Sequence, residues 1–440
     1  MKFLFMSLKV YLAERLWLRP AVFGIVAVLA VVVAFGVDQW IKLPFDFSIK
    51  EQTIRGLLTI MASAMLTVAT FSVSVMLSSY VAAISSSTPR AFSVVLTDST
   101  SKQAISTFIG AFTYSVVGLI GLNVGVFQSS GRIVLFFTTL WVFAWVVGTL
   151  IYWIDHVARI STVTSTISRV SDQARDILTR HLTHPGHGGT PIYANTLPPA
   201  GAAPVLSGLT GTVRYIDVDG LAVLAEAANF RVQVAVQLGD LIGRDTVVAW
   251  IFEAAPEAAD DETLKRIRRA IRIGQSRHRS EDPVLALQTL SEIADRALSP
   301  GVNDPGTAKD ILDALVQVFA DATDASHDVG TASQNSRVLV PIIDPDVILT
   351  AAFEQIARDG AGFVEVAVHL QKALSAIESC LPAAWKPALL LQSDRALARA
   401  RQAMTNDHDI ARVEAAATRM DQLAEASGTA GMASATGFRP

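Results

Sequence analysis

Residues 56–84 read GLLTIMASAMLTVATFSVSVMLSSYVAAI and decide the fold of this chain, because they contain no Asp, Glu, Lys or Arg. A helix of about 20 apolar residues spans the hydrocarbon core of a bilayer, so this stretch is long enough to cross a membrane. Residues 21–37, 105–127 and 133–154 also lack charge. A charge at mid-bilayer costs at least about 2.5–3.5 kcal/mol on insertion scales, so four such windows in succession predict four transmembrane helices.

The composition of the whole chain agrees with a membrane protein that carries a large water-facing region. Of 440 residues, 51% are apolar and only 17% are charged. The formal net charge of −4 gives no support to a generally basic, nucleic-acid-binding protein. Cys380 is the single cysteine, which excludes an internal disulfide. The first apolar run begins about twenty residues in and exceeds the usual ~7–15 of a signal peptide, which favours a retained helix.

The distribution of Lys and Arg around the helix ends predicts the orientation in the membrane. One side collects Lys2, Lys9, Arg15, Arg19, Arg90, Lys102, Arg159, Arg169, Arg175 and Arg180, and the other has Lys42, Lys50, Arg55 and Arg132. Because cations concentrate on the cytoplasmic side, we expect both termini and the large C-terminal region to be inside.

The second apolar stretch carries a regular series of hydroxyl side chains. They are Thr59, Ser63, Thr67, Thr70, Ser74, Ser78 and Ser85, and Ser72 and Ser79 lie off the series. At ~100° per residue the seven fall within an arc of roughly 100°. Uncharged hydroxyls suit a water-filled path, but small hydroxylated residues also let membrane helices pack closely. Both interpretations stay open, and a pore built from four spans requires a ring of identical subunits.

The third apolar stretch shows a packing face of small residues. Ala111, Ser115, Gly118, Gly121 and Gly125 recur at three-to-four spacing. Only residues 128–132 separate this stretch from the fourth, so we expect an antiparallel hairpin of two spans.

The chain changes in composition after the spans, and we divide it accordingly. We expect a transmembrane domain at 1–156, a helical extension and flexible linker at 157–203, a small β-rich unit at 204–255, a helical domain at 256–426 and a disordered tail at 427–440. The predicted fold class is therefore membrane α-helical, with four transmembrane helices, both termini inside, and a cytoplasmic α+β region in which a small β-barrel-like unit precedes a helical domain.

The β-rich unit contains a hairpin phrase, residues 236–247, that resembles a biotinyl/lipoyl-type sandwich barrel. No lysine occurs between Gly211 and Leu264, so attachment of a prosthetic group is excluded and a scaffold role is expected. His181, His184 and His187 have a spacing that could bind metal, but no carboxylate or cysteine joins them, so we expect no metal site.

The strongest basic cluster follows the β-rich unit. Its members are Lys265, Arg266, Arg268, Arg269 and Arg272. A solvated or lipid-headgroup-facing surface is the ordinary interpretation of such a cluster in a membrane protein. A pocket for an anionic ligand, built from Lys265, Arg268, Arg269 and Arg272, is the alternative.

A short loop separates two predicted helices at Ser299-Pro300-Gly301-Val302-Asn303-Asp304-Pro305. Asp304 is suited to cap the following helix and Pro305 to be its first residue. The free amides of that helix start could bind an anion with help from Arg272 or Arg296, although a rigid inter-helix turn is the favoured interpretation.

Three stretches make the chain resemble the DUF2254 family of predicted bacterial membrane proteins. They are residues 85–91 (SSSTPRA), 107–112 (TFIGAF) and 297–305 (ALSPGVNDP), the last being the most specific. The likeness covers nearly the whole chain and implies a membrane protein without an assigned activity. Gly306 departs from it, since a bulkier residue is expected after the proline.

The sequence lacks the motifs of common enzymes and coupled transporters. It has no phosphate-cradling Gly-Lys-Ser/Thr loop, no His-Glu-x-x-His, no Cys-x-x-Cys and no Gly-x-Ser-x-Gly elbow. We therefore expect a non-enzymatic homo-oligomeric channel of the bacterial inner membrane, with the hydroxylated helix at its axis and no cofactor. Expected partners are membrane lipids, other copies of the chain, and ions or a small anionic ligand, but no nucleic acid. The alternative function is a non-conducting membrane-anchored sensor or scaffold.

Overall fold

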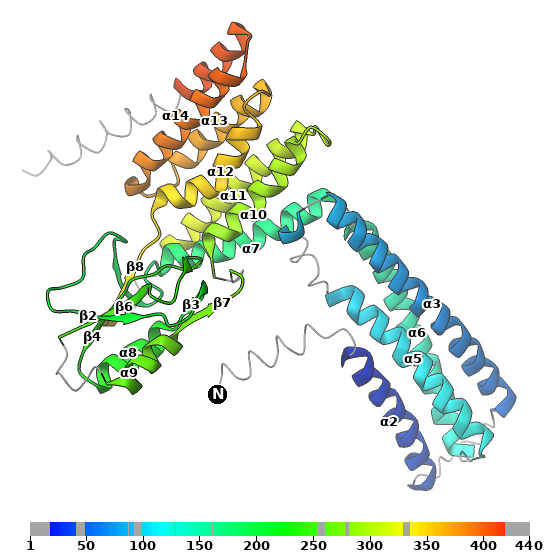
Figure 1. The fold of residues 1–440 in the computed structure, drawn as a ribbon. Helices are drawn as coiled ribbons and strands as arrows, with labels where there is room; N and C mark the ends of the chain where they lie inside the picture. The colour runs from blue at the N-terminus through cyan, green and yellow to red at the C-terminus, as the bar shows by residue number, and fades with distance from the viewer. Residues whose placement is uncertain are drawn as a thin grey trace, which may run out of the picture. The chain divides into compact units, whose positions relative to one another are not determined.

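The computed structural model describes residues 18–40, 49–86, 88–91, 99–125, 127, 129–160, 162–253, 260–277, 281–328 and 335–418. The chain divides into two compact units, Met1–Thr166 and Ile167–Pro440, here called the apolar unit and the α/β unit. Figure 1 shows the elements of both. The tail predicted to be disordered, at 427–440, lies outside the described residues.

The apolar unit consists of long helices that match the four apolar stretches. They are α2 (Leu18–Trp40), α3 (Glu51–Ser86), α5 (Ser99–Asn123) and α6 (Ser129–Ile160). Three segments within them, Glu51–Val81, Thr100–Asn123 and Gly131–Ala158, are long and apolar enough to cross a membrane. In α2 the apolar run Pro20–Val33 is shorter. Membrane-capable helices are thus confirmed by length and composition for three of the four predicted spans.

Helix α5 is the centre of the apolar unit, because α2, α3 and α6 all pack against it. Its small residues permit this close approach. A Cβ atom on Gly118 would lie 3.1 Å from Cδ1 of Leu58 in α3, and one on Gly110 would lie 3.1 Å from Cβ of Phe23 in α2. Ala111 and Ser115 are buried on the same helix. The predicted packing face is therefore present at Ala111, Ser115 and Gly118, whereas Gly125 lies beyond the end of α5.

The hairpin predicted between the third and fourth spans is also present, with α5 packed against α6. The sequence predicts the connection at residues 128–132, whereas in the structure α5 ends at Asn123 and α6 begins at Ser129. The connection therefore lies a few residues earlier than predicted. Gly125 adopts a φ of +74°, which ends the helix at low steric cost for a residue without a side chain. Tyr114 ties the two helices together: its hydroxyl lies 2.8 Å from Oγ1 of Thr138 and 3.1 Å from Oγ1 of Thr139.

Helix α3 is longer than a bilayer requires. Its 36 residues extend about 54 Å at 1.5 Å per residue, against a hydrocarbon core of about 30 Å. Near its start Glu51 bridges Arg55 (2.7 Å) and Arg132 of α6 (3.0 Å), which joins the first turns of the two helices by ion pairs.

The α/β unit begins with the amphipathic helix α7 (Val163–Thr183) and contains two sheets. The five-stranded sheet has the order β1 (Gly189–Ile192), β8 (Asn335–Pro341), β4 (Arg231–Val234), β6 (Val247–Phe252), β2 (Ala203–Leu206). The three-stranded sheet has the order β5 (Leu241–Ile242), β3 (Gly211–Ile216), β7 (Ile271–Gly274). Helices α8 (Val218–Ala227) and α9 (Asp261–Ala270) lie beside these strands (Figure 1).

The sheets correct two boundaries expected from the sequence. The range 157–203, expected to be a helical extension and linker, contains strand β1, and the range 256–426, expected to be helical, contains β7 and β8. The physical reason is pairing over long sequence separations: β1 pairs in parallel with β8, and β7 pairs with β3. The two strands of each pair are far apart in the sequence, so the local periodicity of the sequence could not reveal them.

The remainder of the α/β unit is helical. It comprises α10 (Pro283–Leu298), α11 (Pro305–Asp328), α12 (Pro345–Asp359), α13 (Val364–Glu378), the short η2 (Ala383–Trp385), α14 (Lys386–Ala403) and a last helix at 407–418. Its core includes Phe319 stacked on Phe353 at 5.9 Å, with Trp385 edge-on to Phe319.

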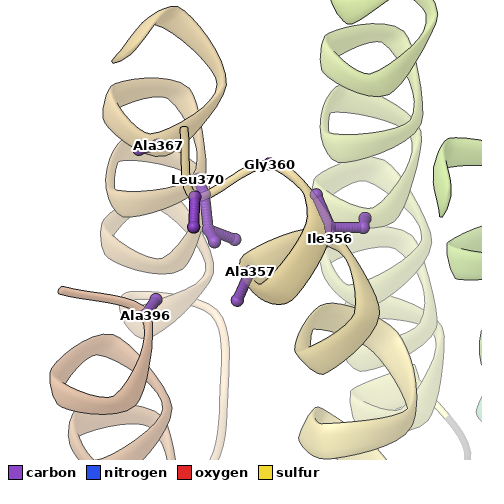
Figure 2. Close-up of a pocket in the computed structure, with 7 residues that line it drawn as sticks. Ile356, Ala357, Gly360, Ala367, Leu370 and Ala396 are labelled. Atoms are coloured by element: carbon purple, nitrogen blue, oxygen red, sulfur yellow. The ribbon is translucent and has the colours of Figure 1, made fainter. Parts of the chain in front are cut away.

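Figure 2 shows a cavity between the end of α12, α13 and α14, lined by Ile356, Ala357, Gly360, Ala361, Ala367, Leu370 and Ala396. Its volume of about 10 Å³ is room for roughly one water molecule, and its lining is apolar. This cavity is a packing void and offers nothing to a polar ligand.

Candidate functional site

The hydroxyl residues predicted on the second span form one exposed face of α3. Thr59, Ser63, Thr67, Thr70, Ser74 and Ser78 are all exposed in the apolar unit. The buried face of the same helix carries Ile54, Leu58, Met61, Met65, Ala69 and Ser72. At 100° per residue the mean directions of the two sets differ by about 180°. The hydroxyl face therefore points directly away from α5, and the packing of this chain does not use it.

Five hydroxyl groups of this face donate to backbone carbonyls of the same helix. Thr59 donates to the carbonyl of Arg55 at 2.8 Å, and Thr70 donates to that of Leu66 at 2.9 Å. Ser63, Thr67 and Ser74 make the same kind of bond at 3.1–3.2 Å. Each oxygen keeps a lone pair that points outward, so the face presents neutral hydrogen-bond acceptors and no charge.

The basic cluster of α9 is exposed, and two of its members already bind protein groups. Arg268 donates from Nε to the carbonyl of Leu206 at 2.8 Å, and the guanidinium of Arg272 lies 5.6 Å from the ring centroid of Tyr215. Lys265 and Arg269 are exposed on the outer side of the helix, whereas Ile267 is fully buried. The four predicted residues are all exposed, three on α9 and Arg272 on β7.

Tyr215, beneath Arg272, has a pKa raised above its usual range by burial and by the negative charges of Asp217, Glu281 and Asp219. Arg272 lowers it, but by less. The phenol is therefore neutral near pH 7, and the pair is held by a cation–π contact.

The loop between α10 and α11 is a turn that satisfies its own polar groups. Ser299 donates from Oγ to the carbonyl of Arg296 at 2.6 Å, and the backbone carbonyl of Ser299 accepts the amide of Asn303 at 2.9 Å. Asn303 has a φ of +53°, in the left-handed region that Asn tolerates better than most residues. Pro300 and Gly301 lie in the same turn and are exposed.

Asp304 caps α11, as the sequence predicts, and Pro305 is the first residue of that helix. Its carboxylate accepts the amide of Thr307 at 3.1 Å and the hydroxyl of Thr307 at 2.7 Å, which holds the pKa of Asp304 below its usual value. The carboxylate of Asp304 thus accepts a free amide at the start of α11 that a bound anion would need. A Cβ on Gly306 would lie 3.1 Å from Oδ1 of Asp304, so a bulkier residue there would crowd the cap.

His181 lies in the last turn of α7, and His184 and His187 follow the end of that helix. Within the described residues, no group of three or more His, Cys, Asp and Glu side chains could hold a metal ion. His181 is buried, and its Nδ1 has no hydrogen-bond partner among the described residues. Burial, followed by the charge of His187, lowers the pKa of His181 to about 4.

Several side chains that organise these surfaces were missed by sequence analysis. Arg277 donates to Asp282 from Nε at 2.6 Å and from its terminal nitrogen at 2.8 Å, and Asp282 also caps α10 by accepting the amide of Leu285. The Asp-Pro at the start of α10 is a capping signal that could have indicated Asp282. Nothing local in the sequence indicates the contact between Arg268 and Leu206.

Comparison with known proteins identifies the family. No solved structure matches this chain. Uncharacterised proteins of Mycobacterium bovis and Mycobacterium tuberculosis are each 26% identical to it over 384 residues, which cover 85% of this chain and 73% of theirs. The family model of predicted membrane proteins named DUF2254 matches residues 13–376. The chain therefore belongs to the DUF2254 family of predicted membrane proteins.

Proposed function

We propose that this protein is a homo-oligomeric, channel-like protein of the bacterial inner membrane, with α3 lining the central axis. In this proposal α2, α3, α5 and α6 all cross the bilayer, both termini are inside, and the α/β unit lies in the cytoplasm. The α/β unit, including its small barrel-like part, serves assembly or gating and has no catalytic role. Ions are the permeant species.

The proposal depends on one observation, the direction of the hydroxyl face of α3. Thr59, Ser63, Thr67, Thr70 and Ser74 are exposed on the side opposite the face that packs on α5. Packing inside one chain is therefore not the reason for the stripe. A neutral hydroxyl face suits a water-filled path, because it can be wetted without trapping an ion.

The small number of spans requires several copies of the chain around the axis. The four helices of the apolar unit form a bundle with α5 at its centre, against which α2, α3 and α6 pack. Apolar side chains fill the interior of this bundle. A pore must then lie between subunits, and a closed ring of identical subunits places the same face of α3 at the axis in every copy.

Conductance of reconstituted liposomes tests the proposal. The replacement of Ser63, Thr67, Thr70 and Ser74 together by Leu should abolish conductance, because apolar constrictions dewet. Thr149 on α6 is a matched control: its hydroxyl donates to the carbonyl of Trp145 at 2.8 Å, like those on α3, but it lies outside the stripe. Thr149→Leu should conduct normally. Conductance that survives the fourfold replacement removes the pore assignment.

Cysteine labelling tests the environment of the stripe separately. In a Cys380→Ser background, Thr67→Cys and Ser74→Cys should react with a charged, membrane-impermeant thiol reagent. Phe71→Cys is the control, because Phe71 is exposed on α3 but is apolar. If Thr67→Cys and Ser74→Cys react only with lipid-soluble reagents, the stripe faces acyl chains and the pore proposal is wrong.

The second candidate function is a non-conducting sensor or scaffold whose α/β unit binds a partner or an anionic ligand. It is favoured by the exposed cations on α9, which a channel does not require. Charge reversal at Arg268, Arg269 and Arg272 should then abolish that binding, and binding that persists unchanged excludes this surface.

A further inference from the structure

The outer side of α9 carries cations and, after the first turn, no acidic side chain of its own. Residues 263–272 contain five cations and no Asp or Glu, whereas the acidic residues of this helix, Asp261 and Glu262, stand in its first turn. Lys265, Arg268 and Arg269 are exposed. The helix is anchored by Ile267, which is buried in the core of the α/β unit, so its charged side faces outward.

Two exposed leucines lie next to these cations. Arg268 donates to the carbonyl of Leu206 at 2.8 Å, which holds the end of β2 against α9. Leu206 is 41% exposed, and Leu209, in the turn that follows, is 59% exposed. The turn is rigid, because Ser207 donates from Oγ to the carbonyl of Leu209 at 2.7 Å.

The same turn brings a further cation to the surface. The amide of Gly208 donates to the carbonyl of Arg244 at 2.9 Å, and Arg244 is exposed. Leu206, Leu209, Arg244, Lys265, Arg268 and Arg269 together are called the α9–β2 surface below. It combines cations with apolar side chains on one rigid framework of hydrogen bonds.

We propose that the α9–β2 surface docks on the face of an anionic lipid bilayer. Its cations are attracted to phosphate headgroups, and its leucines can enter the boundary between headgroups and acyl chains. A free anion or the phosphate backbone of a nucleic acid would pair with the cations and leave both leucines in water. The chain also carries its own membrane-capable helices, so lipid is a ligand that the rest of this chain can already bind. This role does not depend on conduction.

Co-flotation with vesicles tests the docking. The full-length chain is held in nanodiscs of phosphatidylcholine and mixed with separate vesicles of phosphatidylcholine, with or without 30% phosphatidylglycerol. We expect capture by the anionic vesicles only, with a decrease at high salt. Lys265→Gln with Arg269→Gln should weaken capture by about 30-fold, because each cation near an anionic surface contributes about 1 kcal/mol, which is about five- to sixfold. Arg268 is retained in this variant because it holds β2.

Matched variants separate a lipid surface from a simple anion site. Lys309→Gln with Lys372→Gln removes two cations from α11 and α13 and should leave capture unchanged. Leu206→Ser with Leu209→Ser should weaken capture by at least about tenfold, whereas Val347→Ser with Leu391→Ser, also exposed, should not.

Three results overturn the inference. One is capture that both the cation variant and the leucine variant leave intact. Another is loss with the cation variant but not with the leucine variant, which indicates a free anion or an acidic macromolecule as the ligand. The third is binding of RNA by the wild-type chain without capture by anionic vesicles.

Discussion

Replacement of His181 by Leu should remove a large part of the acid sensitivity of the α/β unit. His181 is 6% exposed in α7, and its Nδ1 has no hydrogen-bond partner among the described residues. Because burial is the main cause of its low pKa, the folded protein keeps this imidazole neutral down to about pH 4. The unfolded chain protonates it at its ordinary pKa of about 6.5.

The sign and size of the effect follow from these two values. Between pH 6.5 and 4 the unfolded chain binds the proton and the folded chain does not, so the free energy of unfolding falls as the pH falls. The depression of about 2.5 pH units corresponds to about 3 kcal/mol below pH 4, of which about 2 kcal/mol is lost between pH 7 and pH 5. Above pH 6.5 both states are neutral and the term vanishes.

Urea unfolding of the full-length protein in detergent, followed by tryptophan fluorescence, measures this loss at pH 7, 6 and 5. His187 also has a pKa lowered by burial, so the wild type and His181→Leu must be compared at each pH. We expect the variant to be at least as stable as the wild type at pH 7, because a buried unpaired nitrogen is removed. His408→Leu, at an exposed position, should keep the wild-type pH dependence. Equal pH slopes for His181→Leu and the wild type would refute the reasoning.

The remaining predictions concern stability. Gly118→Leu should destabilise the apolar unit by about 1–3 kcal/mol, because a Cβ there already lies 3.1 Å from Leu58. Gly148→Leu, where no atom lies within 4 Å, is the control, and an equal melting temperature in detergent for both variants contradicts this account. Asp304→Ala should cost about 1 kcal/mol by removing the cap to Thr307. Asp304→Asn should retain most of that stability, and an equal loss in both variants would show that the cap is not the cause.

The sequence alone determines the features that depend on neighbouring residues or on the bilayer as solvent. Hydrocarbon excludes charge from every residue of a span, so the apolar stretches at 56–84, 105–127 and 133–154 predict α3, α5 and α6 directly. The cap at Asp304 is equally local, because its carboxylate binds Thr307 only three residues later. The spacing of the small residues in α5 likewise predicts a close-packed helix face.

The tertiary structure alone decided how these elements are used. From Gly56 onward every face of α3 is uncharged, so its sequence does not say which side packs. The contact of Leu58 with Gly118 of α5 places the hydroxyl face on the outside of the bundle. Strand β1 exists because it pairs with β8, some 145 residues later. Arg268 meets Leu206 across 62 residues, which creates a mixed cationic and apolar surface. In each case the deciding interaction joins residues that are distant in the chain, and local periodicity carries no information about such pairs.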